Sequence, residues 1–343
     1  MLTVYVDDFL LSGPEKEHAP FWEELSKRVK LEDIAGLGRF LGRYHELCDI
    51  QGKRTFLFSM PDYVRSTCDL YLTLPGSKPL KSVPTPFVNE GSLSADDDES
   101  RGELADNASK VLMKALWVAR LARPDLLRPI TALARHVQSW TKNCDKQLYR
   151  LICYMHSTTD LKLSGFINDP LDKVELHLYV DADFAGSRGD TKSTSGGFLC
   201  ISGKNTFFPL CWVSKKQTST SKSTAESELV SLSTSLFEEG IPMLNFWQTV
   251  SGRALTLKIK EDNEATIKIA KKGFSPKLRS LTRTHRVNIG AIHEEIQKPD
   301  IVLEYCPTLE QIADIFTKSI DPQKWQHAID LPHTIEVKTA SKT

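Results

Sequence analysis

The chain has 343 residues, of which 40% are hydrophobic, and this is enough apolar material for two ordinary cores. Lysine plus arginine and aspartate plus glutamate each number 44, so the net charge gives no indication of a polyanionic partner. Seven cysteines without a C-x-x-C pair argue against a zinc module and a disulfide framework, and no apolar run approaches membrane length. We expect a protein that is not secreted and has no membrane partner.

Two adjacent acids stand between two apolar runs near the N-terminus, in the stretch LTVYVDDFLLSG of residues 2–13. This pattern predicts a β-hairpin with Asp7 and Asp8 at its tip. The sequence after it predicts an amphipathic helix over 20–29, a second hairpin from 39–47 and 54–59, and a helix that begins after Ser59 and Pro61.

The composition changes over residues 75–107, where four prolines precede the acidic run 96–99. This change predicts a loop or linker, and its acids indicate a solvated spacer more than a metal site. Three helical patterns follow over 110–121, 125–140 and 145–157. We expect them to form a helical unit.

Residues 176–236 carry the clearest periodicity in the chain. Leu176, Leu178 and Val180 alternate with polar residues, which predicts a half-buried strand with Asp181 near its C-terminal end. Further short runs over 196–201 and 206–213 complete an antiparallel meander of three strands. A helix with Glu228 on it follows, so that a strand carboxylate is joined by a helix carboxylate.

The last third of the chain predicts two more strands and a closing helix. Leu257 and Ile259 alternate toward Asp262, which has the opposite parity, as Asp181 has in its own strand. Residues 301–305 predict the last strand, and residues 309–318 predict a helix that carries Asp314. This order of elements predicts an α/β (α+β) fold with a mixed five-stranded sheet whose later, parallel strands are covered by crossover helices.

Four ordered phrases, YVDADFAG, KSTSGG, CWVSKKQ and STAESELVSLS, closely resemble the ribonuclease H domain of copia-type retrotransposon Pol polyproteins. The resemblance extends downstream through EDNEATI to QIADIFTK and upstream to YVDDFLLSG, so it covers most of the chain. It implies a ribonuclease H-like sheet preceded by the end of a reverse transcriptase. The implied units are a truncated palm and thumb remnant (1–87), an acidic linker (88–109), a helical connection (110–169), the ribonuclease H domain (170–322) and a C-terminal tail (323–343).

The resemblance implies four catalytic and metal-binding acids, Asp181, Glu228, Asp262 and Asp314. In-line hydrolysis of a phosphodiester needs both the attacking water and the leaving oxygen to be stabilised, and two Mg²⁺ ions about 4 Å apart can do so if carboxylates hold them. Asp183 has the same strand parity as Asp181 and competes with it. Glu226 competes with Glu228, although the E-L-x-x-L frame favours Glu228.

The same resemblance implies that Tyr5, Asp7 and Asp8 are a remnant of the Tyr-x-Asp-Asp motif of reverse transcriptases. Polymerase chemistry needs a further carboxylate, which the family supplies from a strand upstream of this motif. We therefore expect no independent polymerase activity.

Basic residues gather over 266–286 without one acid, and a second group lies near the candidate site. They form a local positive surface that suits phosphates, and a solvated helix face with a basic loop is the alternative interpretation. The nucleic-acid-binding candidates are Lys192, Lys215, Lys216, Lys271, Lys272, Arg279 and Arg283.

The expected function is Mg²⁺-dependent hydrolysis of the RNA strand of an RNA–DNA hybrid. We expect the protein in the cytoplasm (virus-like particle) or nucleus, with the rest of a Pol polyprotein as partner where present. The alternative is an inactive relic that at most binds nucleic acid.

Overall fold

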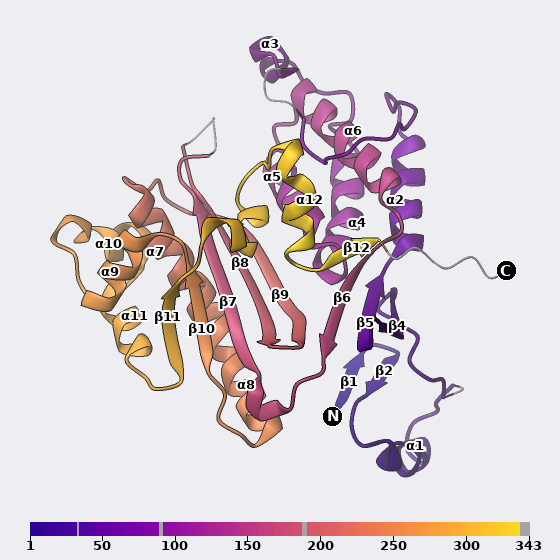
Figure 1. The fold of residues 1–343 in the computed structure, drawn as a ribbon. Helices are drawn as coiled ribbons and strands as arrows, with labels where there is room; N and C mark the ends of the chain where they lie inside the picture. Colours follow the sequence, from indigo (N-terminus) through magenta and orange to yellow (C-terminus); the bar gives the residue numbers. More distant parts are fainter. Residues whose placement is uncertain (33, 89–91, 187–190, 337–343) are drawn as a thin grey trace.

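The structure is a computed structural model that describes residues 1–32, 34–88, 92–186 and 191–336. A large β-sheet runs through the molecule, with helices packed on both of its faces (Figure 1). The strands are β1 (Leu2–Tyr5), β2 (Asp8–Leu11), β3 (Arg39–Phe40), β4 (Arg43–Ile50), β5 (Lys53–Ser59), β6 (Leu161–Ile167), β7 (Glu175–Asp183), β8 (Thr194–Gly203), β9 (Thr206–Lys216), β10 (Leu257–Glu261), β11 (Ile301–Tyr305) and β12 (Thr334–Glu336). The α-helices are α1 (His18–Ser26), α2 (Pro61–Leu72), α3 (Ala95–Glu99), α4 (Ala108–Leu121), α5 (Leu127–Ala134), α6 (Lys142–Ser157), α7 (Thr224–Ser235), α8 (Ile241–Ser251), α9 (Glu264–Lys272), α10 (Leu281–His285), α11 (Ile289–Ile296) and α12 (Pro322–Asp330).

Five neighbouring strands have the arrangement expected from the sequence. β7, β8 and β9 form an antiparallel meander, β10 pairs in parallel with β7, and β11 pairs in parallel with β10. The connection from β10 to β11 carries α9, α10 and α11, because parallel neighbours need a crossover. The expected mixed α/β (α+β) fold, a ribonuclease H-like mixed sheet with flanking helices, is therefore confirmed.

These strands direct alternate side chains into two hydrophobic cores. Leu178 and Val180 of β7 belong to the core covered by α7, by a π-helical turn at Leu236–Gly240 and by α8. Phe198 of β8 belongs to the opposite core, which contains residues of α4, α6 and α12. Because side chains alternate along a strand, Asp181 points away from the first core and toward the second.

The sheet extends beyond the five expected strands. β6 pairs with β9 at two positions only, Phe166 with Phe207 and Ile167 with Thr206, and then continues the sheet to β5, β4 and β3. β6 lies in residues 110–169, where only helices were expected. Residues 323–336, expected to be a tail, form most of α12 and all of β12, and β12 pairs with β6. These pairings join distant residues, so no local pattern predicts them.

The closing helix expected over 309–318 is wrong in detail. The structure has two short 3₁₀ helices there, Thr308–Glu310 and Ile312–Phe316. They are separated at Gln311, whose backbone is extended and whose side-chain amide donates to the carbonyl oxygens of Val180 and Lys260, at 3.0 and 3.3 Å. Gln311 thus links β7 to β10, which a continuous helix would not allow. The helix expected over 125–140 is likewise shorter, and consists of a 3₁₀ turn at Pro124–Leu126 followed by α5.

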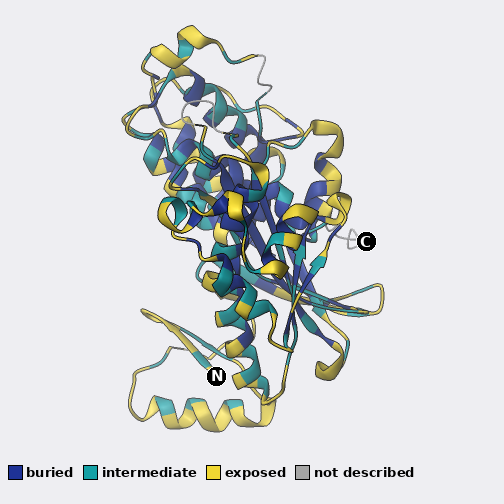
Figure 2. Ribbon diagram, turned by 90° about the vertical axis from the view of Figure 1, so that its left-hand side faces the viewer, coloured by how far each residue is buried: buried dark blue, intermediate teal, exposed yellow. Residues whose placement is uncertain are grey.

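The N-terminal hairpin forms a separate two-stranded sheet that contacts β3 of the large sheet. Among the described residues β1 and β2 pair only with each other, and none of the residues of β1, β2 or α1 is buried (Figure 2). Tyr5 pairs with Asp8, so Val6 and Asp7 form the tip, where Val6 has a positive φ of 50°. Within the described part of the chain, none of the helices combines the length and the apolarity that a bilayer crossing requires.

Candidate active site

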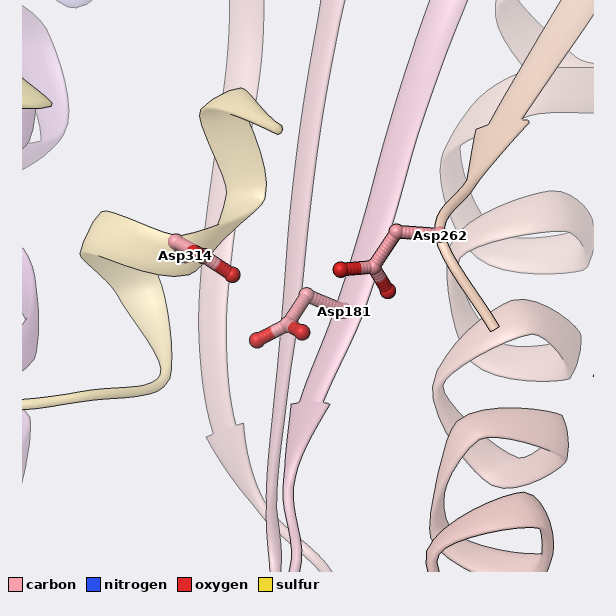
Figure 3. Close-up of side chains that lie close together, drawn as sticks. All are labelled: Asp181, Asp262 and Asp314. Carbon is pink, nitrogen blue, oxygen red and sulfur yellow. The ribbon is translucent and has the colours of Figure 1, made fainter. Parts of the chain in front are cut away.

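Three aspartates from distant parts of the chain meet near the C-terminal end of β7 (Figure 3). Asp181 lies on β7, Asp262 directly follows β10, and Asp314 lies in the 3₁₀ helix Ile312–Phe316. One carboxylate oxygen from each aspartate lies within 4.8 Å of those of the other two. Asp181 is buried and the other two are half-buried, so the cluster can be reached from solvent on one side.

The register of β7 and β10 explains why Asp181 and Asp262 are neighbours. Leu257 lies opposite Leu176 and Lys260 lies opposite Tyr179, so the same register continued by two residues sets Asp262 beside Asp181. Side chains at matching positions of parallel neighbours point the same way. The parity seen in the sequence therefore anticipates this contact.

A glycine allows Asp314 to reach Asp181. Gly196 on β8 pairs with Asp181, and a Cβ at this position would lie 2.5 Å from Thr317 Cγ2 and 2.9 Å from the Ala313 carbonyl oxygen. Real Cβ contacts are not this short, so residues 313–317 can lie against the sheet only because position 196 has no side chain.

Polar groups next to the three aspartates fix their orientation. The Lys318 ammonium donates to Asp181 Oδ1 at 3.0 Å and to Asp314 Oδ1 at 2.7 Å. Burial alone would lower the pKa of Lys318, but the two carboxylates outweigh it and raise that pKa. The Thr317 hydroxyl donates to Asp181 Oδ2, and the Thr308 hydroxyl donates to Asp262 Oδ2 at 3.0 Å. These three residues were not identified from the sequence.

Glu228 belongs to a second carboxylate group that shares Asp262 with the first. Oxygens of Glu228, Glu261 and Asp262 lie within 4.8 Å of one another. Glu261 was also missed in the sequence, although it continues the parity of Leu257 and Ile259 and so places a charge in an aliphatic row. That mismatch is the signal that could have identified it.

Burial and mutual repulsion shift the titration of these acids upward. Burial, followed by the charge of Asp181, raises the pKa of Asp314 to about 7 and also raises the pKa of Asp262. Burial raises the pKa of Glu228 to about 11, with Glu261 as the largest contributor among the neighbouring charges. Burial likewise raises the pKa of Glu261. The acids therefore repel one another unless a cation or protons lie between them.

The residues present fit a divalent cation. Every donor in the two groups is a carboxylate oxygen, the hard ligand that Mg²⁺, Mn²⁺ and Ca²⁺ select. Oxygen ligands on opposite sides of such an ion lie roughly 4–5 Å apart. The observed limit of 4.8 Å is compatible with this span.

The two competing acids lie outside both groups. Glu226 is buried, accepts from the Lys222 backbone N–H at 2.8 Å and lies 3.8 Å from His285 Nε2. Asp183 is the last residue of β7. It belongs to neither of the two carboxylate groups found among the described residues. The geometry therefore favours Asp181 and Glu228 as members of the acidic clusters.

The basic candidates form two sets. Lys215 and Lys216 pair with Ser195 and Thr194 on β8, at the same end of the meander as Asp181. Lys215 also makes an exposed ion pair with Glu238 at 3.2 Å. Lys192 precedes β8 at this end. The other set, Lys271, Lys272, Arg279 and Arg283, is exposed on the α9–α10 segment, where Lys272 lies 4.5 Å from the centre of the exposed Phe274 ring.

Asp7 and Asp8, which the sequence resemblance implies are a polymerase remnant, lie in no potential metal-ligand cluster of the described residues. Both residues are exposed. The Tyr5 ring lies 6.5 Å from that of Trp117 on α4. The absence of polymerase activity expected from the sequence stays a prediction.

A sheet ordered β9-β8-β7-β10-β11, with acids at the ends of its two central strands and on a C-terminal segment, is the ribonuclease H-type arrangement that the sequence resemblance implies. No family model matches the chain. The chain is 25% identical over 95% of its length to the retrovirus-related Pol polyprotein from transposon RE1 of Arabidopsis thaliana. It is 24% identical, again over 95%, to that from transposon TNT 1-94 of Nicotiana tabacum.

The expected relationship to copia-type retrotransposon Pol polyproteins is therefore confirmed, because the curated homologues along 95% of the chain are retrovirus-related Pol polyproteins from transposons. The chain spans only 21% of the RE1 polyprotein and 24% of the TNT 1-94 polyprotein.

Two solved structures were also found to be similar. One is a foamy viral protease-reverse transcriptase in complex with double-stranded DNA (13% identity, TM-score 0.46, 90% of this chain and 46% of that chain). The other is LC11-RNase H1 isolated from compost (18% identity, TM-score 0.28, 42% of this chain and 92% of that chain). These scores are low, so the fold class rests on the strand order and register of the chain itself.

Proposed function

We propose that the chain is a retroelement ribonuclease H that uses divalent cations, namely Mg²⁺, to hydrolyse the RNA strand of RNA–DNA hybrids. The observation that carries this proposal is the convergence of Asp181, Asp262 and Asp314 at the C-terminal ends of the neighbouring strands β7 and β10, where Asp262 and Asp314 are half-buried. Three carboxylates at one point repel one another and would cost stability without a function, whereas they suit metal ions that promote phosphodiester hydrolysis.

In this proposal Asp181, Glu228, Asp262 and Asp314 hold the cations. Bound divalent ions supply stabilisation of the charge on the attacking and leaving oxygens. Thr317 and Thr308 orient the carboxylates of Asp181 and Asp262 through their hydroxyl groups. Lys318 offsets part of the negative charge of the site.

The basic residues supply contacts to the nucleic-acid backbone. Lys192, Lys215 and Lys216 lie at the end of the meander that carries Asp181. The α9–α10 set begins with Lys271, about nine residues after Asp262. Nine residues of helix span roughly 13 Å, so this set lies about that far from the site. The two sets would bind backbone phosphates on either side of the cleavage position, without contacts to the bases.

The test uses the full chain, because residues outside 170–343 support the site. Arg128 of α5 is buried and its Nε donates to the Thr317 carbonyl oxygen at 2.8 Å. A hybrid with a labelled RNA strand is incubated with the wild type or Asp262→Asn in Mg²⁺ or Mn²⁺, and a labelled DNA duplex serves as specificity control. We expect cleavage of the hybrid RNA by the wild type and a loss of at least about 100-fold in the variant.

Hybrid binding without cleavage by the folded wild type would instead identify an inactive relic that binds nucleic acid. Equal cleavage by the wild type and Asp262→Asn would show that the activity comes from elsewhere, and would also contradict the proposal.

A further inference from the structure

Glu261 occupies an unusual position for an acidic residue. It ends β10 on the aliphatic parity, and its exposed fraction is 0%. Its Oε1 accepts from the Asn263 backbone N–H at 3.0 Å, but its Oε2 is buried without a hydrogen-bond partner. The same holds for Oε2 of Glu228, which is 3% exposed. Buried polar atoms almost always have partners, so two orphaned carboxylate oxygens in one cluster call for a ligand.

We propose that Glu261 is a fifth metal ligand, and that Glu228, Glu261 and Asp262 form a divalent cation subsite of their own. This inference rests on the proposed function, since it assigns the ligands of one ion of that site. Carboxylate oxygens of the three residues lie within 4.8 Å of one another, and two of them offer an unused oxygen. A hard divalent cation such as Mg²⁺ or Mn²⁺ satisfies both oxygens at once.

The two subsites differ in the charge that already balances them. Lys318 lies between Asp181 and Asp314 and pairs with both. No such ion pair reaches Glu228 or Glu261 among the described residues, and the neighbouring Lys260 pairs with Glu304. The Glu228–Glu261–Asp262 subsite therefore has the greater need for an external cation.

The position of the strand explains how Glu261 reaches this subsite. Lys260 lies opposite Tyr179, so Glu261 continues the register opposite Val180, whose side chain faces α7. Glu228 lies on α7 and is buried on its inner side. Asp262, one residue further and half-buried, connects this inner subsite to the accessible one.

Mn²⁺ titrations of the full chain, followed by the electron paramagnetic resonance of free Mn²⁺, test the proposal. The variants are Glu261→Gln and, as a second member of the same subsite, Glu228→Gln. Glu226→Gln is the matched control, because Glu226 is also a buried glutamate at the start of α7 but lies outside both carboxylate groups. We expect two bound ions in the wild type and in the control, and loss of one ion or about tenfold weaker binding in each subsite variant.

Thermal unfolding gives an independent readout and controls for folding. In EDTA, Glu261→Gln should melt close to the wild-type temperature, because the amide has nearly the same shape as the carboxyl group and can donate to the unpartnered Glu228 Oε2. With Mn²⁺ the stabilisation of this variant should be smaller than that of the wild type. A merely structural glutamate would instead lower the melting temperature equally with and without metal.

Wild-type Mn²⁺ binding by Glu261→Gln would overturn the proposal, even if Glu228→Gln lost an ion. This outcome is distinct from failure of the proposed function, which is decided by cleavage of the hybrid. A chain that cleaves the hybrid but binds Mn²⁺ unchanged in these variants keeps its function and loses this subsite. A chain that loses an ion in both variants but cleaves no hybrid keeps the subsite alone.

Discussion

Gly196→Ala is the substitution that most sharply separates the geometry of the site from the stability of the fold. The new Cβ would lie 2.5 Å from Thr317 Cγ2 and 2.9 Å from the Ala313 carbonyl oxygen. Carbon atoms in contact prefer about 3.5–4.0 Å, so the segment that carries Asp314 must move by roughly 1 Å. The Ala313 oxygen belongs to the backbone and cannot swing aside, as a side chain could.

We expect this shift to cost about 1–3 kcal/mol of stability, as overpacked cores do. A displacement of about 1 Å at reacting groups can cost on the order of 100-fold in rate. The assay is therefore kcat for hybrid cleavage, with urea unfolding measured on the same preparations. The fold should survive while most of the activity is lost.

Gly197→Ala is the matched control on the same strand. Its Cβ would meet Ser235 Oγ at 2.7 Å, the end of a side chain that can rotate away on the opposite face of the sheet. Near wild-type kcat is expected for this variant. Wild-type kcat in a folded Gly196→Ala, or an equal loss in both variants, would refute the role assigned to the close approach.

Three further predictions follow from other parts of the structure. Asp125→Ala should lower the free energy of unfolding in urea by about 3–5 kcal/mol, because it leaves the buried Arg123 guanidinium, 1% exposed, without its carboxylate. A loss below about 1 kcal/mol would contradict this. The metal-free chain in EDTA should lose stability as the pH rises from about 4, the pKa of an unfolded aspartate, to about 7, the pKa of Asp314 in the fold. The reason is that a raised pKa in the fold stabilises the folded form only while Asp314 is protonated. The melting temperature should therefore be lower at pH 8 than at pH 5, and an equal or higher value at pH 8 would contradict this. Lys318→Met should tighten Mn²⁺ binding, because the ammonium between Asp181 and Asp314 no longer offsets their charge; unchanged or weaker binding in the same resonance titration would contradict this.

Sequence periodicity was sufficient to predict the five central strands and the meeting of two acids. Asp181 and Asp262 share the parity opposite to their aliphatic rows, and parallel pairing turns a shared parity into spatial proximity. The order of the elements then predicted the topology, because crossover connections restrict how parallel strands follow one another.

Other features depend on contacts that local patterns do not contain. The 3₁₀ helix of Asp314 is short because Gln311 bonds to two strand carbonyls instead of continuing a helix. β6 joins the sheet through only two pairs with β9, and its other partners come from β5 and β12 at opposite ends of the sequence. Support of the site by Arg128 likewise requires a contact across 189 positions of the chain. Local sequence cannot specify such pairings.

The most direct measurement of the central idea is the location of bound metal in crystals of the full chain soaked in Mn²⁺. Anomalous scattering should show a peak bounded by the carboxylates of Asp181, Asp262 and Asp314, and a second peak beside Glu228. Crystals that bind Mn²⁺ only at other surfaces, while the carboxylates remain as close as they are here, would contradict the account.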